Sequence, residues 1–172
     1  MLDVLKAKIR DIRDFPRQGV VFKDITPLLE DPYTFQLVVD VLAHRFIGCH
    51  IDRVVGIEAR GFVLGAALAY KLNTGFVMVR KPGKLPAETL KAAYELEYGI
   101  DELEIHRDAM PPGSRVVLVD DVLATGGTAS AVIKLVTALQ CEIVELVFLL
   151  ELSFLNGRRR LQESHIFSLI QY

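Results

Sequence analysis

Two adjacent carboxylates, Asp120 and Asp121, stand between an apolar run and a glycine pair in the stretch VVLVDDVLATGGTA, residues 116–129. Carboxylate oxygens accept hydrogen bonds from hydroxyl groups, so a pair of them suits the neighbouring hydroxyls of a sugar. Side chains alternate along a strand, so the two carboxylates need not crowd one another. We therefore interpret the pair as a candidate sugar-binding site.

The segment ATGGTA, residues 124–129, is expected to open a helix. Glycines let the backbone approach a ligand closely, and the unpaired amides of a helix N-terminus attract anions. Thr125 and Thr128 add hydroxyl donors. An acidic pair followed by this turn predicts one ligand that carries both a ribose and a terminal phosphate. Two better-known phosphate motifs, G-x-x-x-x-G-K-[ST] and G-x-G-x-x-G, do not occur in the chain.

Short apolar segments alternate with helical ones through most of the chain, and this pattern decides the fold class. Strands are expected at 53–57, 75–79, 115–119 and 142–150, and helices at 2–12, 62–72, 128–140 and near 155–163. A further helix should start at Asp31, a capping residue followed by a proline. The alternation predicts an α/β fold with a mainly parallel central sheet flanked by helices. In such sheets ligands bind beyond the carboxyl ends of the strands, where the aspartates are expected.

Composition and charge narrow the number of domains, the classes of partner and the location that we expect for the chain. The chain has 172 residues, of which 51% are hydrophobic and 24% charged, which fits one globular domain over 1–172. A net charge of −2 predicts no nucleic-acid partner, so an anion site must be local. No segment resembles a signal peptide or a membrane span. Cys49 and Cys141 have no metal-site spacing, and a reduced cytoplasmic setting is expected.

Four segments together carry a resemblance to a known family. VVLVDDVLATGGTA resembles the phosphoribosyl pyrophosphate signature of type I phosphoribosyltransferases. Three others resemble the members of that family that use adenine: DFPRQGVVFKDITPLL, GIEARGFVLGAALA and RKPGKLPAETLKAAYELEYG. The resemblance implies the type I phosphoribosyltransferase fold, with a small N-terminal hood within residues 1–30 and a flexible catalytic loop. The mixed, Pro- and Gly-containing segment 80–110 is where a binding loop or lid is expected.

The resemblance also implies how the sugar-phosphate donor is bound. Asp120 and Asp121 would hold the ribose hydroxyls. The 5-phosphate would lie in the loop formed by Ala124, Thr125, Gly126, Gly127 and Thr128. The pyrophosphate would be bound at Glu58, Ala59, Arg60, Arg80 and Lys84, with a cis peptide between Glu58 and Ala59 or beside it. Mg²⁺ would be held mainly by substrate oxygens and water, with Asp120 or Asp121 acting through a water and no direct protein ligand.

The base and the chemistry would involve two other segments. Adenine would stack between Phe22 and Val122, while its polar edge meets backbone groups near Val21 and Lys23. Glu97 would act as the acid or base on the purine, and Tyr98 would close the loop over it. Glu95 is a competing candidate, but only Glu97 lies within the LEYG match. The resemblance further implies a homodimer in which an arginine of the neighbouring subunit completes the site.

Alternatives remain open at this point. Pro82 stands where some relatives carry a basic residue. A hypoxanthine/guanine or xanthine enzyme would share residues 116–129 but not the N-terminal segment FPRQGVVFKDITP. A regulator of the same fold would bind the donor without turnover. The basic run Arg158, Arg159 and Arg160 is interpreted as a solvated helix face.

Overall fold

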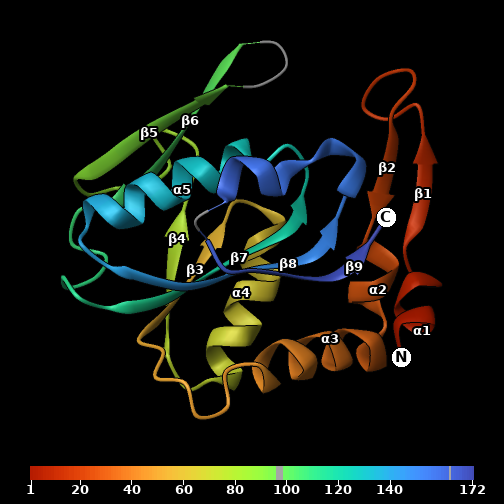
Figure 1. Ribbon diagram of the computed structural model, residues 1–172, viewed down its shortest axis with the longest axis horizontal. Coiled ribbons are helices and arrows are strands. Elements are labelled where there is room, and N and C mark those ends of the chain that lie inside the picture. Colours follow the sequence, from red (N-terminus) through yellow and green to blue (C-terminus); the bar gives the residue numbers. More distant parts are fainter. Residues whose placement is uncertain (96–98, 163) are drawn as a thin grey trace.

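The computed structural model, which describes residues 1–95, 99–162 and 164–172, contains a five-stranded parallel sheet. Its strand order is β4-β3-β7-β8-β9 (Figure 1). The five strands are β3 (Arg53–Ile57), β4 (Gly75–Val79), β7 (Arg115–Leu123), β8 (Glu142–Glu151) and β9 (Ile166–Gln171). The predicted α/β architecture with a mainly parallel central sheet is therefore confirmed.

Each face of the sheet is covered by its own layer (Figure 1). Helix α5 (Gly127–Ala138) lies on one face, and helices α3 (Pro32–His44) and α4 (Arg60–Lys71) lie on the other. Alternate residues of the buried strands serve the two layers. In β3, for example, Val55 packs on the α5 side and Val54 on the α4 side, and both are fully buried. This two-sided burial explains why these strands are continuous apolar runs.

The N-terminal region forms a small hood beside the sheet, and one prediction for it was wrong. The expected helix over 2–12 stops early: α1 covers Leu2–Lys6, and Arg10–Arg13 forms strand β1, which pairs antiparallel with β2 (Val21–Asp24). Cross-strand ion pairs join Arg10 to Asp24 and Lys23 to Asp11, both at 2.7 Å. These partners come from a distant segment, so pairing with β2 outweighs the local helical spacing.

Helix starts and strand ends define the region of the sheet where a ligand is expected. The Asp31 carboxylate accepts hydrogen bonds from the amides of Tyr33 and Thr34, so the predicted cap is confirmed; the short helix α2 (Thr26–Glu30) precedes it. Strand β7 continues past the predicted end at 119, because it pairs with β8 as far as Leu123 and Glu151. The two aspartates are thus part of the strand.

The segment 80–110 contains a long antiparallel hairpin, drawn in green in Figure 1. Its strands are β5 (Thr89–Glu95) and β6 (Ile100–His106). Its base is tied to the end of β4 by two backbone hydrogen bonds between Arg80 and Glu104, 3.0 and 2.8 Å long. The short helix expected near 155–163 is instead two 3₁₀ turns, η1 (Ser153–Leu155) and η2 (Gly157–Leu161). Among the described residues, no helix combines the length and apolarity needed to cross a membrane.

Candidate active site

A cavity of about 360 Å³ lies at the carboxyl edge of the parallel sheet. It brings together the hood, the turn between β3 and α4, the end of β7, the start of α5 and the hairpin. Many of the residues predicted from sequence line it, namely Val21, Phe22, Lys23, Glu58, Ala59, Arg60, Asp120, Asp121, Val122, Ala124 and Thr128. The volume lies within the range of small-molecule sites.

The aspartate pair forms the acidic centre of this cavity. Asp120 accepts a hydrogen bond from the amide of Asp121 at 2.9 Å, and Arg60 Nε lies 2.7 Å from Asp121 Oδ2. Burial, followed by the charge of Asp121, raises the pKa of Asp120 well above its ordinary value. Burial also raises the pKa of Asp121, and the Arg60 guanidinium opposes that rise. The Arg60 charge therefore favours the ionised form of the pair against the effect of burial.

Close packing at Gly61 places this pair against helix α4. A Cβ atom at Gly61 would lie 2.9 Å from both Asp120 Oδ1 and the Val119 carbonyl oxygen. Only glycine lets the first turn of α4 approach β7 so closely, and that approach delivers Arg60 to Asp121. This requirement was not recognised from the sequence, although Gly61 directly follows Arg60 in the matched segment.

The loop before α5 forms a separate recess next to the aspartates. It encloses about 50 Å³ and is lined by 120, 122–129 and Phe148, so it contains all five residues predicted to hold the 5-phosphate. Gly126 is the N-cap of α5 and has φ +80°. This left-handed conformation turns the chain so that the first amides of the helix, which lack intrahelical partners, border the recess. The arrangement suits a small anion.

The predicted cis peptide lies between Glu58 and Ala59. The Glu58 side chain, only 9% exposed, accepts hydrogen bonds from Arg80 Nη2 at 3.2 Å and the Lys81 amide at 2.8 Å, and it contacts Lys84 Nζ. Burial favours the neutral acid, but the hydrogen bonds from Lys84 and Lys81 lower the pKa of Glu58 to about 2. The carboxylate is therefore ionised at neutral pH and binds Arg80 and Lys84, two of the three cations predicted for pyrophosphate.

The hood covers the cavity with Phe22, whose ring lies 4.8 Å from the Arg60 guanidinium carbon and packs edge-on against Phe15. The Lys23 side chain is used elsewhere, because its ammonium pairs with Asp11 and lies 4.0 Å from the Tyr172 ring centre. Lys23 therefore offers the cavity its backbone. Val122 on β7 lines the same cavity.

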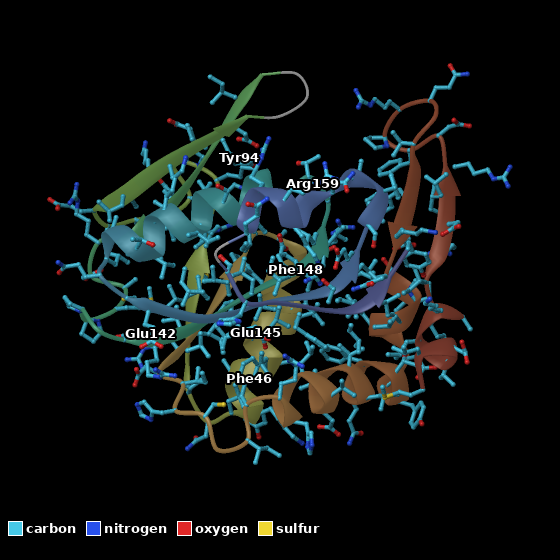
Figure 2. All side chains as sticks on the ribbon, viewed as in Figure 1. Phe46, Tyr94, Glu142, Glu145, Phe148 and Arg159 are labelled. Atoms are coloured by element: carbon cyan, nitrogen blue, oxygen red, sulfur yellow. The ribbon has the colours of Figure 1, made fainter. Side chains whose placement is uncertain are left out.

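Three residues of the segment 80–110 also line the cavity and were missed from the sequence, namely Lys81, Tyr94 and Leu103. The Tyr94 hydroxyl donates to Asp101 at 3.1 Å, and Asp101 also pairs with Lys81 Nζ. Burial raises the pKa of Tyr94. Figure 2 shows Tyr94 where the hairpin meets α5. The predicted residues Glu97 and Tyr98 lie outside the described residues.

The cavity offers a metal ion few protein ligands, although the carboxylates that it does offer are of a suitable kind. In the described ranges, no group of three or more His, Cys, Asp or Glu residues could hold a metal ion. Within the same ranges, Asp121 Oδ2 is buried and has no hydrogen-bond partner of good geometry. Carboxylate oxygens are the ligands that Mg²⁺ prefers, and this ion commonly keeps several waters. The residues fit a Mg²⁺ ion that is bound mostly by substrate and water.

A larger cavity, of about 580 Å³, lies at the opposite edge of the sheet and is lined by residues such as Arg53, Tyr70 and Gly75. It lies at the amino ends of β3 and β4 and has neither the acidic pair nor the glycine turn. In parallel sheets the carboxyl edge is the usual ligand side. We therefore assign the candidate active site to the 360 Å³ cavity.

Comparison with known proteins gives consistent results. A family model described as "Phosphoribosyl transferase domain" matches residues 36–169. The adenine phosphoribosyltransferase of Geobacter metallireducens is 61% identical over 171 residues, covering 99% of this chain and 100% of that protein. The crystal structure of adenine phosphoribosyltransferase from Thermoanaerobacter pseudethanolicus superimposes with a TM-score of 0.97 at 53% identity, covering 100% of both chains. The Saccharomyces cerevisiae enzyme, crystallised with D-2,5-dideoxy-2,5-imino-altritol 1,6-bisphosphate and adenine, gives a TM-score of 0.92 at 44% identity over 97% of both chains.

Proposed function

Because this chain belongs to the phosphoribosyltransferase family, we propose that it is an adenine phosphoribosyltransferase. It transfers the 5-phosphoribosyl group of phosphoribosyl pyrophosphate to adenine, yielding AMP and pyrophosphate in purine salvage. One observation carries the proposal: a single cavity contains a carboxylate pair, a phosphate-sized recess at its border and an aromatic hood. The relatives compared above carry the adenine name, which leaves the hypoxanthine/guanine, xanthine and regulator alternatives without support.

The donor is proposed to lie along the carboxyl edge of β7. Asp120 and Asp121 accept hydrogen bonds from the ribose hydroxyls, and the amides and hydroxyls of 124–128 bind the 5-phosphate. Both groups come from one continuous segment, so the distance between them is set by the strand end and the first turn of α5. The Saccharomyces cerevisiae protein was crystallised with an imino-sugar bisphosphate, which has the same two kinds of groups.

Adenine is proposed to bind between Phe22 and Val122, with backbone groups of Val21 and Lys23 at its polar edge. Stacking on an aromatic ring is tolerant of purine type. Discrimination therefore comes from the backbone donors and acceptors, which pair with an exocyclic amine and would face an exocyclic oxygen unpaired. The diversion of the Lys23 side chain toward Asp11 and Tyr172 supports this, because it leaves the backbone accessible.

The reaction forms a bond between a purine nitrogen and the anomeric carbon while the bond to the pyrophosphate oxygen breaks. Positive charge grows on the sugar, next to the aspartate pair, and negative charge grows on the departing pyrophosphate. We assign to Arg60, Arg80 and Lys84 the stabilisation of that negative charge, which should be stronger in the transition state than in the ground state. The proton lost by adenine is assigned to Glu97. When bound, Mg²⁺ supplies further charge neutralisation on the pyrophosphate.

A homodimer is part of the same proposal. Val63 and Tyr70 on α4 and Met78 on the edge strand β4 are exposed apolar side chains, by 44%, 87% and 43%. The helix and the strand pack together, so these residues offer one apolar face to a second copy. Light scattering should give twice the chain mass, and a monomer would contradict this part.

Two further assignments concern the location of the protein in the cell and the classes of partner that it binds. We propose a cytoplasmic location, which the two free cysteines Cys49 and Cys141 support. The net charge of −2 supports a function that involves neither nucleic acid nor membrane surfaces.

The direct test is release of pyrophosphate from phosphoribosyl pyrophosphate with adenine and Mg²⁺. The wild-type chain should release pyrophosphate in step with AMP formation. The Asp120→Asn, Asp121→Asn double variant should lose affinity for the donor. Undiminished donor affinity in that variant would remove the ribose role from the pair.

A further inference from the structure

The second 3₁₀ turn, η2, lies directly against the loop that borders the phosphate recess. Figures 1 and 2 show η2, which carries Arg159, beside the first turn of α5. The two segments are about thirty residues apart in sequence, so only the tertiary fold brings them together. None of the sequence motifs extends to η2.

The contact between them is made by two glycine backbones. A Cβ atom at Gly126 would lie 2.6 Å from the Gly157 carbonyl oxygen. A Cβ atom at Gly157 would overlap the Ala124 carbonyl oxygen and lie 3.1 Å from the Gly126 amide nitrogen. Those neighbours are backbone atoms of the recess itself, which cannot swing aside as a side-chain end can. Any side chain at 157 must therefore displace residues 124–126.

An ion pair holds η2 in this position. The Arg158 guanidinium binds the Glu151 carboxylate in a two-pronged manner, with Nε–Oε1 and Nη2–Oε2 distances of 2.8 and 2.7 Å. Its Nη1 donates to the Ile166 carbonyl oxygen at 3.2 Å. Glu151 ends strand β8 and is only 6% exposed. The guanidinium thus fastens η2 to the sheet, so the interpretation of a solvated face was wrong for Arg158, whereas Arg159 and Arg160 are exposed as expected.

We propose that Gly157 and Arg158 are positioning residues for the 5-phosphate of the sugar-phosphate donor, because they press η2 onto residues 124–126 and so fix the shape of the recess. This inference rests on the proposed function for the identity of the ligand. It assigns to η2 a role in recognising a phosphate monoester that neither residue touches. The hydrogen bonds to a phosphate depend on amide directions, which a small shift of the loop would spoil.

The experiment compares Gly157→Ala with the matched control Gly75→Ala. A Cβ atom at Gly75 would meet only the flexible end of the Arg53 side chain, 2.8 Å from Cδ, at the edge of the sheet away from the recess. Both glycines have φ outside the left-handed region, so the two variants differ in what the added Cβ atom meets and not in their own φ. The probe is ribose 5-phosphate, whose affinity is measured by titration calorimetry, alongside KM for adenine at saturating donor.

We expect Gly157→Ala to weaken ribose 5-phosphate binding about tenfold or more, through loss of charge-assisted hydrogen bonds. KM for adenine should match that of Gly75→Ala, whereas the melting temperature of Gly157→Ala should be the lower of the two, because its Cβ atom overlaps the Ala124 carbonyl oxygen. Wild-type affinity for ribose 5-phosphate in Gly157→Ala would overturn the proposal, as would an equal loss for both ligands.

A second variant tests the proposal in case Gly157→Ala does not fold. Arg158→Lys keeps the charge but loses the two-pronged geometry. It should weaken ribose 5-phosphate binding several-fold and leave KM for adenine unchanged, and an unchanged affinity would overturn the proposal. A wild-type chain that binds ribose 5-phosphate but forms no AMP would refute the proposed function alone, because the binding comparison does not depend on turnover.

Discussion

Replacing Arg60 by alanine should move the acid limb of the activity profile to higher pH. Arg60 Nε lies 2.7 Å from Asp121 Oδ2 and opposes the rise in the pKa of Asp121 that burial causes. Without the guanidinium, the aspartate pair binds a proton at higher pH. The ribose hydroxyls donate hydrogen bonds, so they need the ionised pair, and donor binding should fail earlier as the pH falls.

The size of the shift follows from the burial of the two partners. The Asp121 side chain is 7% exposed, but the Arg60 side chain is 41% exposed. An exposed ion pair contributes about 0–1 kcal/mol, whereas breaking a buried one costs about 3–5 kcal/mol. A half-exposed pair should lie between these limits, at about 1–2 kcal/mol. Because one pKa unit equals about 1.4 kcal/mol, the acid limb should move up by about one pH unit.

The assay is the pH dependence of kcat/KM for phosphoribosyl pyrophosphate, which reports ionisations of the free enzyme. Arg60→Ala will also lower the plateau, but the position of the limb is independent of its height. The control is Arg45→Ala, which breaks the Arg45–Glu145 pair of 2.6 Å far from the cavity. An acid limb at the same pH in Arg60→Ala and wild type would refute the role of Arg60.

The remaining predictions concern other parts of the site. Asparagine at both Asp120 and Asp121 should lower kcat/KM for the donor about 100-fold or more, through loss of charge-assisted hydrogen bonds, as steady-state kinetics would show. Glu97→Gln should lower kcat about 100-fold with little change in KM; full activity would remove it as the base. Gly61→Ala should destabilise the fold by about 1–3 kcal/mol in urea unfolding, because its Cβ atom would press on Asp120. The pKa of Glu58 is lowered from 4.5 to about 2, so its charge stabilises the fold above pH 4.5 and this contribution is lost as the pH falls through about 2. Glu58→Gln should therefore show a flatter fall in unfolding free energy over that interval.

Much of the fold could be predicted because buried parallel strands have an unambiguous sequence pattern. The strands at 53–57 and 75–79 have the predicted bounds, since apolar runs that end at turns leave few alternatives. The helix expected over 2–12 was too long because Ile9 and Ile12 continue the helical spacing of Leu2 and Leu5. The partners that draw Arg10–Arg13 into a strand come from β2, and local periodicity contains no information about them.

The structure brings many of the residues predicted for the site to one cavity and its adjoining recess, while their roles stay predictions. Asp120, Asp121 and the glycine turn form a local motif, and the structure places them at one cavity and its adjoining recess. Contacts made across long sequence distances were missed. Tyr94 enters the cavity from the hairpin, and Gly157 fits against Gly126 only because η2 is fastened to β8. Tyr94 lies within the matched segment 80–99, but the segment does not reveal that this side chain enters the cavity, and Gly157 lies in no motif. Each owes its role to tertiary packing.

The central claim is most directly tested by base competition. Equal concentrations of adenine, hypoxanthine and guanine are supplied together with limiting phosphoribosyl pyrophosphate and Mg²⁺, and the nucleotide products are separated and quantified. The account predicts AMP as the dominant product, with one pyrophosphate released for each AMP formed. Predominant formation of IMP or GMP, or consumption of the donor without any nucleotide product, would contradict it.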